Sequence, residues 1–285
     1  METLFQLLID SAMNMYAALR FLIIPAIVFL ILQIHFRREH WLSDLKQAKQ
    51  ETGLSLKILL FNAAVSVPLI SIVLTFLHGW IHEHGLYLFK SAHWEALPVP
   101  LVLFFAVFFG DFVGYWRHRF EHTPILWPAH AVHHSDTEVT WLTSARWHPF
   151  NLLTVHGIAG TAMLVMGFPV WALLFNSMMR GQYGFFIHAN LPWTYGKLGK
   201  FIVSPAMHRW HHSAEEKAFD KNFAEIFCLF DRMFGTYYLP GPCDGPLGVH
   251  DDMKPTLRSQ IGFAFTPKAY KRLFARKPAT KEAKA

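Results

Sequence analysis

Long apolar runs separated by short polar loops dominate the first part of the chain. Three of these runs reach or approach the roughly 20 residues that an α-helix needs to cross a bilayer. They cover residues 16–34, 58–77 and 97–115. A fourth apolar stretch, residues 152–187, is broken by Gly167 and Pro169, which favours a helical hairpin that enters the membrane and returns. The pattern predicts an all-α integral membrane protein with about four transmembrane or hairpin helices.

Basic residues gather on one side of this predicted layout. Those in or beside the loop between the first two runs are Arg37, Arg38, Lys46, Lys49 and Lys57. The next loop, residues 78–95, holds only Lys90. Because cytoplasmic loops carry the excess of Lys and Arg, the first of these loops is expected in the cytoplasm. The third run then ends on the cytoplasmic side of a multi-pass protein, and we expect the C-terminus on the same side.

Three histidine boxes follow the third run. Their residues are His118 and His122, then His130, His133 and His134, and finally His208, His211 and His212. The first box has the spacing H-x-x-x-H, and the other two have the spacing H-x-x-H-H. On a helix, residues three and four apart share a face, so each box can aim its imidazoles into one pocket. Their position at the end of a run predicts a metal site at the cytoplasmic surface.

The number of imidazoles indicates two metal ions. A structural zinc ion takes about four ligands and a catalytic zinc ion about three, so eight imidazoles exceed the needs of one ion. Imidazole suits iron, zinc, copper and nickel, and ligand type alone therefore leaves the metal open. The boxes hold almost no carboxylate, unlike soluble di-iron bundles with Glu ligands. We expect a cytoplasmic helical cap that holds a histidine-rich dimetal site.

The order and spacing of the boxes resemble the fatty acid hydroxylase superfamily, which includes the sterol desaturases. In this chain the first two boxes lie close together after a membrane run, and the third lies downstream of the predicted hairpin. The similarity covers residues 97–238. The further matching segments are residues 146–149, 188–190, 204–209 and 230–237, together with Asn222.

The resemblance implies an O2-dependent oxygenase that hydroxylates or desaturates a lipid such as a fatty acyl lipid or a sterol. It also implies two non-haem iron ions, bound by the eight box histidines and by His188 as a ninth ligand, with Asn190 placed to hold a metal-bound water. The alternative for His188 is a hydrogen-bonded residue of the returning hairpin. Electrons are expected from a separate reductase, ferredoxin or cytochrome, because the chain has no G-x-G-x-x-G motif and only two cysteines.

The expected organisation follows from the same resemblance. Residues 1–96 are interpreted as N-terminal transmembrane helices and loops, residues 97–240 as the catalytic domain, and residues 241–285 as a basic cytoplasmic tail. The tail would suit anionic lipid head groups, although residues 277–285 equally suit a solvated segment. The expected partners are the membrane, a lipid substrate and the electron donor, and not nucleic acid.

Two more residues are candidates from their positions. Asp111 is a carboxylate in an apolar run, seven residues and so two helical turns before His118. We expect it to accept the free N–H of a ligand imidazole. The competing interpretation is a salt bridge to Arg117, Arg119 or Arg146. The same hydrogen bond could be accepted by Glu121, Asp136 or Glu225. His148 precedes a proline and is expected in extended backbone, as a ligand, as a donor near the ligands or as a structural residue.

Three other protein classes deserve comparison with the oxygenase. A metal transporter would place its ligands near the membrane midplane, whereas these boxes follow the end of a run. Haem takes two axial histidines and leaves the rest unexplained. The H-E-x-x-H motif of zinc proteases is absent from the sequence. The sequence therefore favours the oxygenase over a histidine-rich metal-binding or metal-transport protein.

Overall fold

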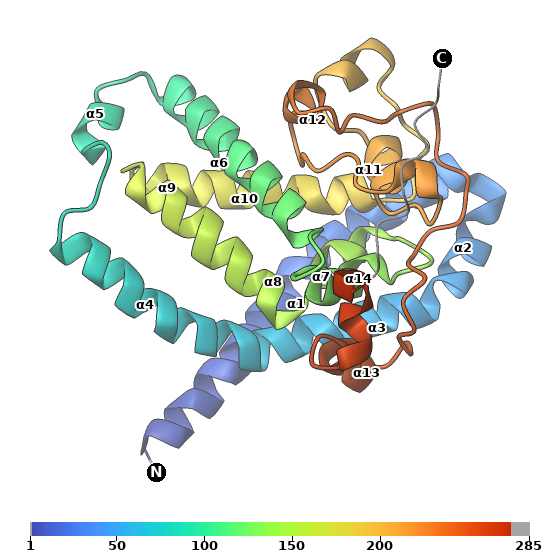
Figure 1. The fold of residues 1–285 in the computed structure, drawn as a ribbon, viewed down its shortest axis with the longest axis horizontal. Helices are drawn as coiled ribbons and strands as arrows, with labels where there is room; N and C mark the ends of the chain where they lie inside the picture. The colour runs from blue at the N-terminus through green and yellow to red at the C-terminus, as the bar shows by residue number, and fades with distance from the viewer. Residues whose placement is uncertain (1, 275–285) are drawn as a thin grey trace.

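The fold consists of helices joined by loops. The structure is a computed structural model and describes residues 2–274. Over these residues the β-structure is limited to two isolated bridges, Ile202 with Phe227 and Ser213 with Leu247. Figure 1 shows long helices that extend toward one side of the molecule and short helices that gather at the other. The all-α fold class predicted from the sequence is confirmed.

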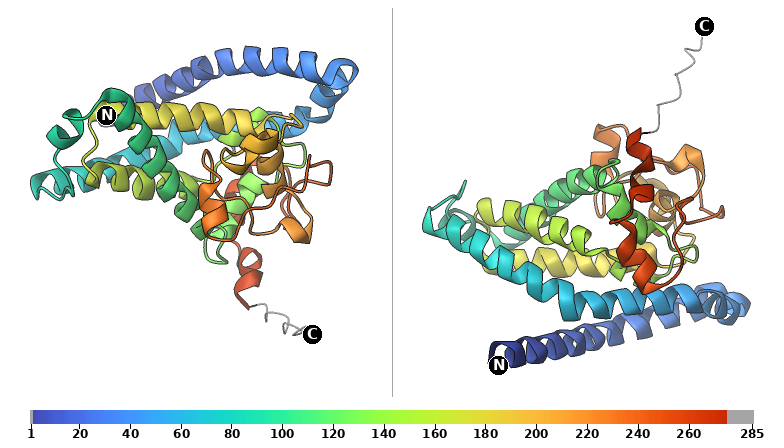
Figure 2. Two further views of the ribbon diagram at one scale, coloured as in Figure 1. Left: turned by 90° about the horizontal axis from the view of Figure 1, so that it is seen from above. Right: turned by 60° about the horizontal axis from the view of Figure 1, so that its bottom comes forward.

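The N-terminal part forms two long helical rods that lie side by side (Figure 2). The first rod consists of α1 (Glu2–Arg37), the 3₁₀ turn η1 (Arg38–His40) and α2 (Trp41–Gln47). The second consists of α3 (Lys49–Phe61), the π-helical segment η2 (Asn62–Ser66) and α4 (Val67–Glu83). The Ser11 hydroxyl donates to the carbonyl of Ala64 across the two rods, at 2.7 Å.

The predicted hairpin is present between the second and third histidine boxes. The hairpin consists of α8 (Pro149–Leu153), the π-helical η4 (Thr154–Gly160), α9 (Thr161–Val165) and α10 (Val170–His188). The helices α5 (Ser91–Glu95) and α6 (Val99–Glu121) precede it in the chain. Gly167, in the turn before α10, has a φ of 73°, and a Cβ there would lie 1.9 Å from the carbonyl oxygen of Phe89. Both the backbone conformation and this close approach require glycine.

Among the described residues, three helices are long and apolar enough to cross a membrane. They are Leu8–Gln47, Lys49–Glu83 and Val99–Glu121. Their outer faces carry large apolar side chains, among them Ile24 and Phe76, which are 72% and 76% exposed. Contiguous apolar surface of this kind is costly in water and is typical of lipid contact. The protein is a membrane protein, and the runs predicted at residues 16–34 and 58–77 lie within the first two helices.

Close packing joins α6 to α10. A Cβ at Gly110 would lie 2.4 Å from Oδ1 of Asn176, and a Cβ at Gly114 would lie 2.4 Å from a guanidinium nitrogen of Arg180. Two glycines four residues apart thus let two polar side chains of α10 cross the face of α6. The end of α10 is thereby held near the end of α6, at the side of the molecule that carries the boxes (Figure 1).

Short helices form a cap on this side. They are α7 (Trp127–His134), η3 (Trp141–Ala145), η5 (Gly196–Lys200), α11 (Pro205–His211), η6 (Glu216–Ala218), α12 (Leu229–Met233), α13 (Leu257–Phe263), η7 (Pro267–Tyr270) and α14 (Lys271–Phe274). Pro128 and Pro205 stand in the first turns of the two histidine helices α7 and α11, where a missing N–H costs nothing.

The segment after residue 240 packs back onto the cap. Phe263 of α13 is buried against Trp127 and Ala131 of α7. Next to α7, the Ser135 hydroxyl donates to the side-chain oxygen of Gln260, at 2.9 Å. The described part of the expected tail is therefore packed structure, and residues 277–285 lie outside the described residues. Domain boundaries at residues 96 and 240 remain predictions.

Candidate metal centre

The structure collects nine histidines into two adjacent groups. The first group contains His118, His122, His130, His134 and His211, and the second contains His133, His188, His208 and His212. Within each group the candidate ligand atoms lie within 4.8 Å of one another. All nine were singled out in the sequence. All of them except His122 are buried.

Each H-x-x-H-H box is divided between the two groups. In α7, His130 and His134 are four residues apart and enter the first group, whereas His133 enters the second. The third box is divided in the opposite sense, since His208 and His212 enter the second group. The simple expectation of one pocket per box is therefore wrong. Residues four apart share a helix face, and the remaining histidine is turned away from them toward the neighbouring group.

The imidazoles in both groups converge through their Nε2 atoms. In the first group, Nε2 of His118 lies 3.0 Å from that of His130 and 2.9 Å from that of His211. In the second group, Nε2 of His188 lies 3.2 Å from that of His133 and 2.9 Å from that of His208. Nitrogens bound about 2.1 Å from one ion and at right angles would be about 3.0 Å apart. The observed spacing therefore fits a shared ion in each group.

Hydrogen bonds to carbonyls fix the tautomers of three imidazoles. His118 Nδ1 donates to the carbonyl of Phe223 at 2.9 Å, and His211 Nδ1 donates to that of Lys221 at 2.7 Å. His188 Nδ1 donates to the carbonyl of Gly184 at 2.6 Å. A neutral imidazole has one N–H, so Nε2 of each of these residues carries a lone pair. Lone pairs aimed at one another form the donor set of a cation site.

Burial keeps the cap imidazoles neutral. It lowers the pKa of the histidines of α7 and of the third box well below the usual value, and neighbouring imidazoles lower it further for each of them. Neutral imidazole is the form that binds metal. Both ring nitrogens of His212 are buried without a hydrogen-bond partner. A buried polar group without a partner is costly, and a bound ion would satisfy it.

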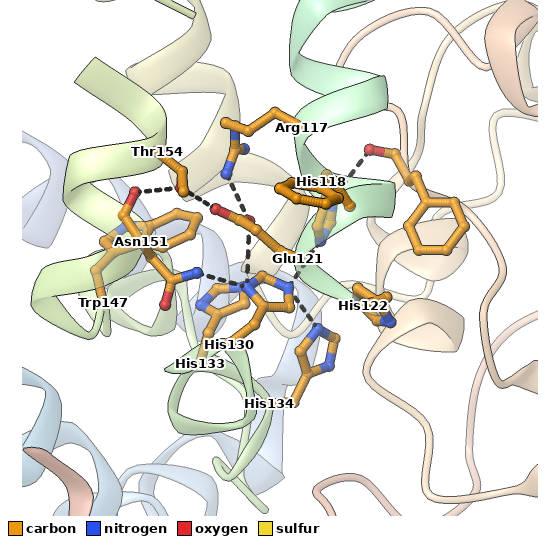
Figure 3. Close-up of polar contacts among 12 residues, drawn as sticks. Arg117, His118, Glu121, His122, His130, His133, His134, Trp147, Asn151 and Thr154 are labelled. Carbon is orange, nitrogen blue, oxygen red and sulfur yellow. Dashed lines mark hydrogen bonds and ion pairs between the residues drawn. The ribbon is translucent and has the colours of Figure 1, made fainter. Parts of the chain in front are cut away.

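A carboxylate lies behind His130 in the first group (Figure 3). Glu121 is fully buried, and its Oε2 is 3.4 Å from Nδ1 of His130 and 2.6 Å from the Arg117 guanidinium. Its other oxygen accepts from the Thr154 hydroxyl. The side-chain amide of Asn151 lies 3.2 Å from the same Nδ1. Of the carboxylates considered from the sequence as alternatives to Asp111, Glu121 is the one found beside a box imidazole.

Asp111 does not contact a histidine, contrary to the expectation from the sequence. Its carboxylate accepts from Arg180 at 2.8 Å and from the backbone N–H groups of residues 225–227. Two helical turns place it about 10 Å along α6 from His118, and it reaches sideways to α10 and the cap. It forms a salt bridge, but not with any of the three arginines considered beforehand.

His148 and Asn190 also lie outside the two groups. His148 Nε2 donates to the carbonyl of Ile261 at 3.0 Å, while Nδ1 accepts from the backbone N–H of Phe150. Both ring nitrogens are used, burial lowers its pKa to about 4, and its position supports the structural interpretation. Asn190 lines a pocket with Phe29 and Trp141 whose lining contains no histidine.

Several groups around the imidazoles could not be identified from the spacing of residues in the sequence. The carbonyls of Lys221 and Phe223 belong to a cap loop, and a backbone acceptor leaves no mark in side-chain spacing. Trp147 stacks on His133, with ring centroids 4.7 Å apart and planes within 6°. An alternating or helical pattern could not assign that contact, because Trp147 lies in an irregular segment.

Comparisons with known proteins agree with this geometry. Residues 103–236 match the family model described as fatty acid hydroxylase. An ornithine lipid hydroxylase, OlsE from Rhizobium tropici, is 24% identical over 67% of this chain and 58% of its own length. An alkylglycerol monooxygenase from Danio rerio is 32% identical over 53% of this chain and 34% of its own length.

A third relative is named for a reaction of very-long-chain aldehydes. A very-long-chain aldehyde decarbonylase from Oryza sativa subsp. indica is 31% identical over 50% of this chain and 54% of its own length. This chain therefore spans between about a third and three fifths of the length of the three relatives. No solved protein structure matches it significantly.

Proposed function

We propose that this protein is a membrane-bound, O2-dependent di-iron oxygenase that hydroxylates a lipid, because residues 103–236 match the fatty acid hydroxylase family model. The observation that carries the proposal is the convergence of buried Nε2 atoms in two adjacent histidine groups. Relatives named as an ornithine lipid hydroxylase and an alkylglycerol monooxygenase support a lipid substrate and favour oxygen insertion. Desaturation of a fatty acyl lipid or a sterol is the related outcome at the same site.

Each histidine group is assigned one iron ion. Bound iron would supply the reduction of O2 and the removal of a hydrogen atom from an unactivated C–H bond. The chain contributes neutral imidazoles and buries them away from bulk water, and carbonyl acceptors keep His118, His188 and His211 in the Nδ1-protonated form. Exclusion of water protects such a reaction from wasteful side reactions.

The apolar helices are assigned to the lipid bilayer and to the lipid substrate. The ends of α6 and α10, which carry His118 and His188, lie at the side of the molecule where α2 joins α3 (Figure 1). The basic residues Lys46 and Lys49 lie at this junction. By the positive-inside rule we assign this side to the cytoplasm, and with it both histidine groups and the cap of a multi-pass protein.

Electrons are assigned to a separate carrier. The described residues contain two free cysteines, Cys228 and Cys243, both buried, and the sequence lacks a dinucleotide-binding fingerprint. A reductase, ferredoxin or cytochrome that docks on the cytoplasmic cap would therefore complete the reaction. Such a carrier would reach the metal centre without crossing the membrane.

Elemental analysis of detergent-purified protein tests the proposal most directly. We expect about two iron ions per chain after anaerobic loading, one for each group of imidazoles. Because His130 belongs to the first group and His208 to the second, the double variant His130→Ala, His208→Ala should lose both. His148→Gln is the matched control, since it alters a buried histidine outside the groups. It should retain the iron of the wild type.

Activity is tested by expressing the protein and the double variant under ¹⁸O₂ and comparing their lipids by mass spectrometry. Oxygen-18 in a lipid made only with the wild type supports hydroxylation. A lipid that loses two hydrogens without gaining oxygen would point to desaturation. Zinc that iron cannot replace, together with an unchanged lipid profile, would overturn the oxygenase and favour a metal-binding or transport protein.

A further inference from the structure

A single loop of the cap supplies the acceptors for two imidazoles of the first group. This loop, residues 219–228, joins the region of α11 to α12. Its carbonyls at Lys221 and Phe223 accept from Nδ1 of His211 and His118, which belong to different boxes. The position of these two carbonyls therefore decides which nitrogen of each ring faces the first group. Contacts that hold this loop in place therefore also orient the Nε2 lone pairs of His118 and His211.

Five successive backbone N–H groups of the loop donate to two buried carboxylates. Asp231 accepts from the N–H groups of Phe223 and Ala224, at 2.7 and 3.0 Å. Asp111 accepts from those of residues 225, 226 and 227, at 3.2, 3.2 and 2.7 Å. We call Asp111 and Asp231 the carboxylate clamp. Bonds from N–H groups to a carboxylate are about twice as strong as those between neutral groups.

The clamp is itself held from both sides. Arg180 of α10 donates to Asp111 at 2.8 Å and also pairs with Glu225 of the loop at 2.5 Å. The Thr236 hydroxyl donates to Asp231 at 2.7 Å. Both clamp carboxylates are fully buried. Burial raises the pKa of Asp231 to about 6, while its three hydrogen bonds favour the ionised form.

The loop also holds a backbone conformation that it would not adopt freely. Asp220 and Asn222 have φ values of 56° and 59°, a region that costs energy for residues other than glycine. The Asn222 side chain ties the loop to neighbouring backbone, because its amide donates to the carbonyls of Met207 and Tyr238. The loop is therefore held by the Asn222 side chain as well as by the clamp, which accepts five of its N–H groups.

We propose that Asp111 and Asp231 are positioning residues of the metal centre, which hold the 219–228 loop so that His118 and His211 present Nε2 to the first group. The proposal rests on the proposed function, because it assigns an ion to that group. The second group offers an internal reference. His188 is oriented by the carbonyl of Gly184 within its own helix, and no bond of the clamp reaches it. Loss of the clamp should therefore weaken one ion site and spare the other.

Anaerobic titration of the metal-free full-length protein with Co²⁺, followed by visible absorption, measures both sites without requiring activity. The variants Asp111→Asn and Asp231→Asn keep the side-chain volume but put an amide where two acceptor oxygens were. We expect one of the two binding steps to weaken about 10–100-fold in each, as for other groups that orient metal ligands. The other binding step should be unchanged.

Asn176→Ala is the matched control. Asn176 lies on the same α6–α10 interface, over Gly110, and has no hydrogen bond to the loop among the described residues. This variant should lower the stability of the helix pair and leave both Co²⁺ steps intact. A purely structural role for the clamp would give the same result for all three variants, with a lower unfolding temperature and unchanged Co²⁺ affinities, and would overturn the proposal.

A milder variant covers the case in which the clamp variants do not fold. Thr236→Val removes the hydroxyl that supports Asp231 but keeps the carboxylate. Selective weakening of one step in folded Thr236→Val would support the proposal, and two unchanged steps would count against it. If the wild type itself binds fewer than two Co²⁺ ions, the assignment of a metal to each group fails first, and that failure is separate from the failure of the clamp.

Discussion

The Nε2 atoms of His118 and His211 lie 2.9 Å apart, although Nδ1 of each ring already donates to a backbone carbonyl. A neutral imidazole has one N–H, so two lone pairs face one another. Burial lowers the pKa of His211 and so opposes a second proton there. The two residues come from the first and third boxes, 93 positions apart in the sequence. A cation bound between the two rings would accept both Nε2 lone pairs.

Metal ions should therefore stabilise the folded protein. We expect Zn²⁺ or Co²⁺ to raise the unfolding temperature of the metal-free protein in detergent, because the ion binds the folded site and not the unfolded chain. At a free metal concentration 1,000 times Kd the gain is about 4 kcal/mol per site. The double variant His118→Ala, His211→Ala should lose the part of the gain that belongs to the first group. The control His148→Gln should keep all of it, and an equal loss in both would contradict the assignment.

Acid should destabilise the metal-free protein. Unfolded histidines titrate near pH 6.5, whereas burial lowers the pKa of the six histidines of the second and third boxes in the folded state. Below pH 6.5 the unfolded chain therefore binds more protons, and stability that is complete above this pH is lost as the pH falls. Each such imidazole contributes up to about 1.4 kcal/mol per pH unit.

Urea unfolding of the metal-free protein between pH 7.5 and 5 would measure this loss. The free energy of unfolding should depend less steeply on pH in His133→Gln and His212→Gln, because each variant removes one buried imidazole. Stability that stays constant over this range would show that the imidazoles are protonated or solvated in the folded protein.

Glu121 should affect both folding and the first group. Glu121→Ala leaves the Arg117 guanidinium without its ion partner, and breaking a buried pair in this way costs about 3–5 kcal/mol. Glu121→Gln keeps the volume and one acceptor oxygen, so its loss of stability should be smaller. We still expect metal affinity to fall about 10–100-fold, because the amide is a weaker acceptor for His130.

Comparison of the two Glu121 variants separates its ion pair with Arg117 from its contact with His130. Chemical unfolding measures the ion pair, and Co²⁺ titration measures the orientation of His130. A Glu121→Gln variant with wild-type metal affinity would show that the 3.4 Å contact with His130 does not orient the ring.

Small residues on α6 should be required for its contact with α10. Gly110→Ala places a methyl group 2.4 Å from Oδ1 of Asn176, so the buried Asn176 side chain or one of the two helices has to shift, at a cost of about 1–3 kcal/mol. Gly181→Ala is the control on α10, because nothing lies within 4 Å of its Cβ position. It should leave stability unchanged or raise it by up to about 1 kcal/mol through helix propensity. Thermal unfolding measures both, and equal effects would contradict the packing argument.

Local periodicity explains why much of this protein could be predicted. The histidines of each box lie three or four residues apart, which places them on a common side of a short helix, and all nine predicted ligands lie in the two groups. The hairpin at residues 152–187 was predicted from run length and from Gly167 and Pro169. By contrast, the partner of Asp111 could not be predicted, because it depends on a cap loop more than a hundred positions downstream.

The sequence by itself determined the helical membrane class, the number of imidazoles and their spacing, because these depend on apolar run length and on helical repeat. Only the tertiary structure decided that each H-x-x-H-H box is shared between two groups, that Glu121 and not Asp111 lies behind a ligand imidazole, and that one loop orients His118 and His211. These relationships depend on how α6, α7, α10 and α11 meet in space. Packing between helices and hydrogen bonds to backbone carbonyls leave no periodic signal in the chain.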